Sequence, residues 1–165
     1  MRSTSQVHQE IDFDLDATDG DGNTALMWAA FGGHQDIVEI LLELESLDIN
    51  KVDSIGLTSL MYACTQGHES IVSTLLDYNA DVNIKDSDGN TALIWAARMG
   101  YDKIVRKLVN ACADIDVKND KQESAASEGK DFKNVIKAMN KVPKHCNKIR
   151  TKHVSGEDDG YDTEF

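Results

Sequence analysis

The chain repeats the stretch GNTALMWAA (residues 22–30) as GLTSLMYAC (56–64) and as GNTALIWAA (89–97), at spacings of 34 and 33 residues. After each copy, at matching distances, come a Gly-His or Gly-Tyr pair, an Ile-Val pair, a Leu-Leu or Leu-Val pair, and an acidic closing segment. Self-similarity at this period is typical of repeat proteins, in which each unit packs only against its neighbours. The sequence therefore predicts a stack of at least three similar units.

Each unit has the sequence features of two short helices. In the first unit, Thr24 is placed to cap a helix over residues 25–31, because its hydroxyl can accept a bond from a free backbone N–H. Gly33 is suited to end that helix in the left-handed conformation. Residues 37–42 then carry apolar side chains at i, i+1, i+4 and i+5, which form a stripe along a second helix. Neither helix can bury its apolar face alone, so the units must stack.

This pattern resembles the ankyrin repeat over about residues 19–118, with a degenerate fourth unit to about residue 141. The resemblance implies an all-α repeat solenoid, an ankyrin stack of antiparallel helix pairs with projecting β-hairpin loops. It also implies a protein–protein interaction module, such as an adaptor, an inhibitor or a complex subunit, with no cofactor and no catalytic activity. The partner is then one or more proteins, bound on the concave face and the hairpin tips.

The sequence departs from the family pattern in two places that matter for packing. Apolar residues take the position of the family's first-helix histidine, which predicts apolar packing in place of a polar network; they are Met27, Met61 and Ile94. The glycine of the closing Gly-Ala-Asp is Asn79 in the second unit and Cys112 in the third. Because cysteine tolerates positive φ poorly, we expect strain or an altered loop near Cys112.

The two ends of the chain differ from the repeats. Residues 1–18 are acidic and alternate apolar and acidic side chains near their end, as the remnant of a capping repeat would. The predicted domain covers residues 19–141, with units at 19–52, 53–85 and 86–118 and a shortened cap at 119–141. Lysines surround the few apolar residues of that cap, as a terminal repeat requires. Residues 142–165 form a basic and then acidic tail that we expect to be disordered.

The resemblance places partner contacts on the hairpin tips and the inner helices. The matching tip positions are Asp21, Asn23, Ile55, Leu57, Asp88 and Asn90. The matching helix positions are Trp28, Phe31, Tyr62, Thr65, Gln66, Trp95, Arg98 and Met99. Trp28, Tyr62 and Trp95 occupy one equivalent position, so stacking should align them as a ladder. Aromatic and arginine side chains are enriched at interface hot spots, although such a ladder could also be core between helix layers.

Composition narrows the classes of function. The formal net charge of −12 argues against a nucleic-acid partner, because affinity for phosphates comes from Lys and Arg. No apolar run approaches the roughly 20 residues of a membrane span, so we expect no membrane insertion. Of the three cysteines, Cys64 and Cys112 are interpreted as small buried hydrophobes in a reducing compartment. We expect a cytoplasmic or nuclear monomer.

Three chemical alternatives are weak in this sequence. The acidic turns at residues 19–30 and 86–97 begin like a calcium loop, but lack its sixth-position glycine and twelfth-position glutamate. The family pattern implies that His34 and His68 bridge backbone groups between loops. A zinc site at Cys146 is not expected, and no nucleophile elbow or phosphate-binding loop is present.

A second class of function would act through the tails, with the stack as a structural tether or a modification substrate. Thr163 and Phe165 end the chain in a pattern that resembles a PDZ-domain ligand, which adds a strand to a sheet edge. Asn50 and Asn83 resemble the ankyrin asparagines that a dioxygenase hydroxylates. Replacing the aromatic ladder would separate the two classes, since tethering predicts unchanged binding.

Overall fold

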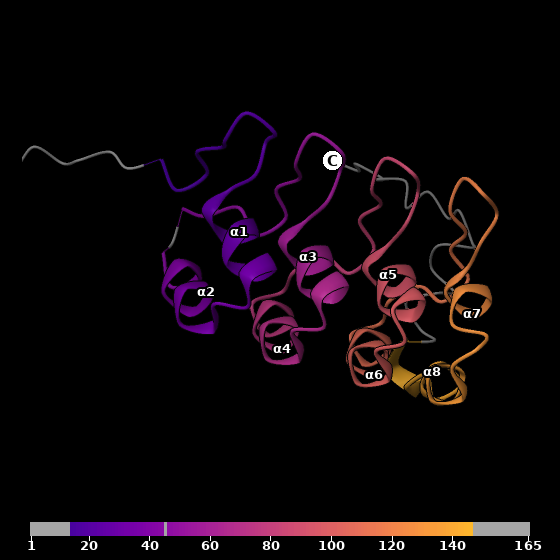
Figure 1. The fold of residues 1–165 in the computed structure, drawn as a ribbon. Helices are drawn as coiled ribbons and strands as arrows, with labels where there is room; N and C mark the ends of the chain where they lie inside the picture. The colour runs from indigo at the N-terminus through magenta and orange to yellow at the C-terminus, as the bar shows by residue number, and fades with distance from the viewer. Residues whose placement is uncertain (1–13, 45, 147–165) are drawn as a thin grey trace, which may run out of the picture.

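A computed structural model describes residues 14–44 and 46–146 of the chain. The described helices form four successive pairs: α1 (Ala25–Gly32) with α2 (Gln35–Leu42), α3 (Ser59–Gln66) with α4 (Glu69–Asp77), α5 (Ala92–Arg98) with α6 (Asp102–Asn110), and α7 (Ala125–Glu128) with α8 (Lys133–Met139). The first helices of the pairs pack in a row, α1 on α3, α3 on α5 and α5 on α7, and the loops project from one side of that row (Figure 1). The predicted all-α repeat solenoid is confirmed.

The loops between units are hairpin turns that join at their tips. In the second loop, the Asp53 N–H donates to the Leu57 carbonyl at 3.1 Å. The Ser54 N–H donates to the Asp21 carbonyl of the preceding tip at 2.9 Å, and the same bond recurs between later tips. The described residues contain one isolated β-bridge, between Lys118 and Ser124, and no β-strand. The hairpins are therefore held by turn bonds and by their neighbours.

We call the first helices of the pairs, α1, α3, α5 and α7, the inner helices. The predicted caps of α1, α3 and α5 are confirmed. The hydroxyls of Thr24, Thr58 and Thr91 accept the N–H three residues later at 3.2, 3.2 and 3.4 Å. Gly33 and Gly67 end α1 and α3 with φ of 76° and 79°. These bonds satisfy backbone groups that a short helix otherwise leaves free at both ends.

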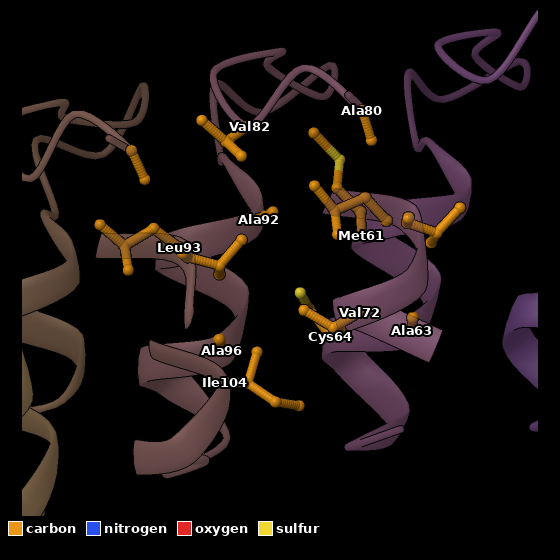
Figure 2. Packing of buried hydrophobic residues seen from close by; sticks show 14 of the residues in the cluster. Met61, Ala63, Cys64, Val72, Ala80, Val82, Ala92, Leu93, Ala96 and Ile104 are labelled. Carbon is orange, nitrogen blue, oxygen red and sulfur yellow. The ribbon is translucent and has the colours of Figure 1, made fainter. Parts of the chain in front are cut away.

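The core lies between the two helix rows and beneath the loops (Figure 2). Ala30, Ala63 and Ala96 are fully buried, and their small side chains let neighbouring inner helices approach closely. The residues in the position of the family's histidine are 1% exposed; they are Met27, Met61 and Ile94. The predicted exchange of a polar network for apolar packing is therefore confirmed.

Among residues 14–44 and 46–146, three residues other than glycine adopt positive φ. Asn79 and Cys112 do so at 62° and 63°, which confirms the expected strained loop at Cys112. The third, Gln122, has φ of 64° at the tip of the last hairpin. It stands where the earlier hairpins have a glycine, for example Gly89 with φ of 79°. A side chain in this conformation costs about 1–2 kcal/mol relative to glycine.

The stack extends beyond the boundary predicted at residue 141. Val142 packs against the core, and Cys146 is buried and forms a disulfide with Cys112. The interpretation of Cys112 as a small buried hydrophobe is therefore wrong, because its half-buried side chain faces a second cysteine that comes back to it after α8. Cys64 is the buried free thiol that was expected. The rest of the predicted tail, residues 147–165, lies outside the described residues.

The described end of the N-terminal segment contacts the first unit. The Asp16 carboxylate accepts the Asp48 N–H at 3.1 Å, and the Lys51 Nζ donates to the Asp16 carbonyl at 2.7 Å. Asn50 and Asn83 make the equivalent bond one and two units later, each accepting the N–H of the next closing aspartate at 2.8 and 2.9 Å. Asp16 therefore begins a ladder of bonds that runs along the closing segments.

Replacing Gln122 by glycine should raise the free energy of unfolding by about 1 kcal/mol, because the positive φ no longer costs steric strain. Urea denaturation followed by circular dichroism measures this change. Lys121→Gly is the matched control, since Lys121 is exposed and does not have positive φ. That control should leave stability unchanged or lower it; an equal gain from both variants would contradict a role for the Gln122 backbone.

The oxidised protein should be more stable than the reduced protein by roughly 3–4 kcal/mol, because the disulfide closes a loop of 34 residues in the unfolded chain. Urea denaturation with and without a thiol reductant measures the difference. The double variant Cys112→Ser/Cys146→Ser should show the same midpoint in both conditions. A reductant effect that persists in this variant would assign the change to Cys64 instead.

Candidate functional site

The inner helices present one ladder of three rings, each tied to the loop that precedes it. The Trp28 indole N–H donates to Asp19 at 3.0 Å and the Trp95 indole N–H to Asp86 at 2.8 Å. The Tyr62 hydroxyl donates to the equivalent aspartate, Asp53, at 2.7 Å. In all three units the aspartate stands nine residues before the ring. The predicted alignment of the three rings in one slot is therefore confirmed.

Each of these aspartates also holds its hairpin turn. Asp53 Oδ1 accepts the backbone N–H groups of Ile55 and Leu57 at 2.9 and 2.8 Å, and the other units repeat this arrangement. In the first unit the hydrogen bond from the Asn23 backbone N–H, above all, lowers the pKa of Asp19 below its usual value. In the turns that resemble a calcium loop, the carboxylates of Asp19 and Asp86 thus bind turn amides and the indole rings.

The three rings of the ladder differ in how much of each is exposed to solvent. The Trp28 side chain is 54% exposed, whereas Tyr62 and Trp95 are half-buried. Phe31 lies between Trp28 and Tyr62 and meets both edge-on, with ring centroids 6.1 and 5.8 Å apart. A hollow of about 210 Å³ opens here, lined by Asn23, Met27, Trp28, Phe31 and Tyr62. Its walls are mostly aromatic, and the sequence alone did not predict this hollow.

The Tyr62 hydroxyl marks the polar and negative side of the hollow. It donates to Asp53 and lies 3.1 Å from Asn23 Oδ1. Burial raises the pKa of Tyr62 first, and the hydrogen bond to Asp53 and the charges of Asp53, Asp19 and Asp21 raise it further. Several carboxylates therefore place a negative potential at this hydroxyl.

At the other end of the ladder an arginine of the chain itself covers the ring. The Arg98 guanidinium lies 4.7 Å from the centre of the Trp95 ring. It also donates to Asn90 Oδ1 at 3.2 Å and forms ion pairs with Glu123 and Glu128. Glu128 occupies the ladder position of the cap, 33 residues after Trp95. This pairing could have been found in the sequence by extending the repeat register into the cap.

Two of the hairpin residues that were predicted to contact a partner are buried, which leaves them little surface for such a contact. Leu57 is 9% exposed because it packs into the core, and Asn90 is 2% exposed because its amide bonds Asp86 and accepts from Asn119. Ile55 is 55% exposed, as expected. The other exposed members of the predicted set are Asp21, Phe31, Gln66, Asp88 and Met99. The half-buried members are Asn23, Thr65 and Arg98.

Of the remaining polar candidates, three have structural partners; they are His68, Asn50 and Asn83. The His68 ring contacts the Phe31 carbonyl at 3.1 Å, so it bridges two units as expected, while His34 is exposed. Asn50 and Asn83 hold backbone amides, as described above, and their hydroxylation stays a prediction. Thr163 and Phe165, the proposed PDZ ligand, lie outside the described residues.

One group of potential metal ligands occurs in residues 14–44 and 46–146. The ligand atoms of Cys112, His145 and Cys146 lie within 4.8 Å of one another. The disulfide holds both sulfurs, which leaves one imidazole where a zinc site needs three or four ligands. No helix of the described chain is long and apolar enough to cross a bilayer.

Tyr62→Phe should lower the free energy of unfolding at pH 8 by roughly 1–2 kcal/mol, through loss of the bond to Asp53. Because the folded pKa of Tyr62 is raised, its contribution is present below the unfolded value of about 10 and declines as pH rises above it. Urea denaturation at pH 8 and 11 should therefore show the gap between wild type and variant narrowing. Tyr78→Phe, at an exposed tyrosine, controls for the other titrating groups; an equal narrowing there would contradict the assignment.

Comparison with known families agrees with the geometry. A family model described as ankyrin repeats in three copies matches residues 4–86 and residues 46–119, which together span more than half of the 165-residue chain. No curated protein matches the sequence significantly. Ankyrin repeats are generally non-catalytic protein–protein interaction modules. The chain belongs to the ankyrin-repeat family.

Proposed function

We propose that this protein binds a protein partner across its inner helices and hairpin tips, with the first two units at the centre of the interface. The observation that carries the proposal is the exposed Trp28 ring, which its bond to Asp19 holds in one orientation at 3.0 Å. An aromatic side chain that is already ordered loses little entropy on binding and removes much apolar area from water.

The neighbourhood of Trp28 supports the same surface. Phe31 and Ile55 are exposed apolar residues on the adjacent helix turn and the next hairpin tip. Such residues around a central aromatic anchor are typical of interface hot spots. Asp21 and Asp88 lie exposed on the tips beside them and can form the polar rim of the interface. The net charge of −12 favours a protein partner over a nucleic acid.

The alternative function, a tether or modification substrate that acts through its tails, remains a separate hypothesis. It assigns recognition to the C-terminal motif ending in Thr163 and Phe165 rather than to the helices. The two hypotheses differ in which part of the chain a partner needs. Deleting residues 147–165 removes the proposed tail motif and leaves every described residue in place.

Affinity capture with purified wild type and variants, read by quantitative mass spectrometry, tests the proposal. Trp28→Ala should reduce recovery of the specific partner at least about fivefold, the effect of losing a hot-spot residue. Ile40→Ala is the matched control, because Ile40 is an apolar residue of α2 that is 63% exposed and lies outside the inner row. Deletion of 147–165 should leave recovery unchanged.

Circular dichroism establishes that each variant is folded before capture. Equal recovery of the same proteins by wild type and Trp28→Ala would overturn the proposed surface. Recovery that is lost on deletion of residues 147–165 but retained in Trp28→Ala would favour the tail hypothesis.

A further inference from the structure

The two ends of the aromatic ladder share a framework, a tryptophan bonded to an aspartate of the preceding loop. They differ in the side chain that lies beside the ring. Trp28 and Trp95 both donate to an aspartate nine residues earlier. The side chain three residues after the ring is Arg98 in the third unit and Phe31 in the first. The third unit therefore shows how this framework accommodates a cation, and the first unit has the framework without the cation.

The contacts of Arg98 define what the framework recognises. The guanidinium lies over the Trp95 ring at 4.7 Å and donates to Asn90 Oδ1 at 3.2 Å. Asn90 is held in place by two bonds from its amide nitrogen to Asp86, at 3.2 and 3.1 Å. A planar, weakly hydrated cation can stack on a ring and bond a carbonyl oxygen at once, which suits arginine.

The first unit repeats the ring, the aspartate and the asparagine around an open space, with Leu57 and Tyr62 in the positions of Glu123 and Glu128, the ion-pair partners of Arg98. Asn23 donates to both oxygens of Asp19, at 3.2 and 3.1 Å, as Asn90 does to Asp86. Asn23 Oδ1 lies 3.1 Å from the Tyr62 hydroxyl, whose one proton goes to Asp53 at 2.7 Å, whereas Asn90 Oδ1 accepts two donors, from Arg98 and Asn119. An amide oxygen has two acceptor positions, as Asn90 shows, so Asn23 Oδ1 can accept a donor from a ligand.

The space beside Trp28 has the size and the charge for a single cationic side chain. The hollow of about 210 Å³ is smaller than the roughly 300–1,000 Å³ of sites for drug-sized ligands. Burial first, and then Asp53, Asp19 and Asp21, raise the pKa of the Tyr62 hydroxyl at its wall, and these three carboxylates make the potential there negative. A neutral apolar side chain would gain no electrostatic attraction from these carboxylates.

We propose that the hollow between Trp28, Phe31 and Tyr62 binds an arginine side chain from a basic segment of the partner protein. The guanidinium stacks on the Trp28 ring and donates to Asn23 Oδ1, as Arg98 does within the chain at Trp95 and Asn90. The assignment rests on the proposed function, since it names the chemistry of the partner at that same surface.

Titration with short peptides tests the assignment. The probe is acetyl-(Gly-Arg-Ser)3-amide, and the comparison peptides carry Lys or Gln in place of Arg. In nitrogen–proton correlation spectra of labelled protein, the Arg peptide should shift the Trp28 indole signal saturably and leave the Trp95 indole signal in place, because Arg98 already covers that ring. The Lys peptide should bind several-fold more weakly and the Gln peptide should not bind.

Two pairs of variants, read by calorimetry, separate the hollow from general acidity. Trp28→Ala should weaken the Arg peptide about fivefold or more, the range of a desolvated cation–π contact, and Ile40→Ala should not. Phe31→Arg copies the third unit and should weaken the peptide at least as much by filling the site from within. Ile40→Arg adds the same charge on α2 and should have little effect.

Several outcomes would overturn the proposal. An Arg peptide that shifts neither indole, or both equally, would show that no arginine site exists at Trp28. An equal loss of peptide affinity in Phe31→Arg and Ile40→Arg would show that only the net charge of the protein matters. A Trp28 signal that moves on dilution of the protein alone would assign the hollow to a second copy of the chain.

The result also separates the two proposals. If Trp28→Ala abolishes partner recovery while the Arg peptide fails to bind, the interaction surface stands and the arginine assignment falls. If Trp28→Ala changes neither partner recovery nor peptide binding, both fall.

Discussion

One carboxylate in each of the first three units connects the projecting hairpin to the inner helix, and the proposed binding surface depends on that connection. In the second unit Asp53 accepts two turn amides through one oxygen and the Tyr62 hydroxyl through the other. A carboxylate is suited to this role because it only accepts, and it offers about four acceptor positions. Without it the turn amides and the ring would have no common partner, and the tip could move relative to the helix.

The cap shows what happens to this arrangement when the ladder residue changes. Its ladder position is Glu128, which has no donor, and the residue in the aspartate position is Asn119. Asn119 still accepts two turn amides, at 3.0 and 2.9 Å, but its amide nitrogen donates to Asn90 and to Glu123. An aspartate here would face Glu123 without a donor, so the amide avoids repulsion between like charges. Arg98 then supplies the positive charge that Glu128 and Glu123 need.

The units therefore share a backbone and differ in what fills one position. Phe31, Thr65 and Arg98 stand three residues after the ladder ring in successive units. Thr65 bonds the Tyr62 carbonyl at 2.8 Å and projects little, whereas Arg98 covers its ring and Phe31 leaves a hollow beside its own. In a stack with short-range contacts, such local differences change the surface without disturbing the neighbouring units. The first unit is thus the one in which the chain's own side chains leave a hollow beside the ladder ring.

The sequence by itself determined the fold, the helix ends and the ladder, because these depend on features local to one unit and repeated three times. Thr24, Gly33 and the apolar stripe of residues 37–42 act within a few residues of their own positions, so their effect can be read from spacing. Burial of Leu57 and Asn90 could not be read in this way, since it depends on how closely the next hairpin tip approaches. The disulfide joins Cys112 to a cysteine 34 residues away, and the hollow at Trp28 forms between two units. Only the tertiary structure decided these features, because each requires the distance between groups that the chain brings together by stacking.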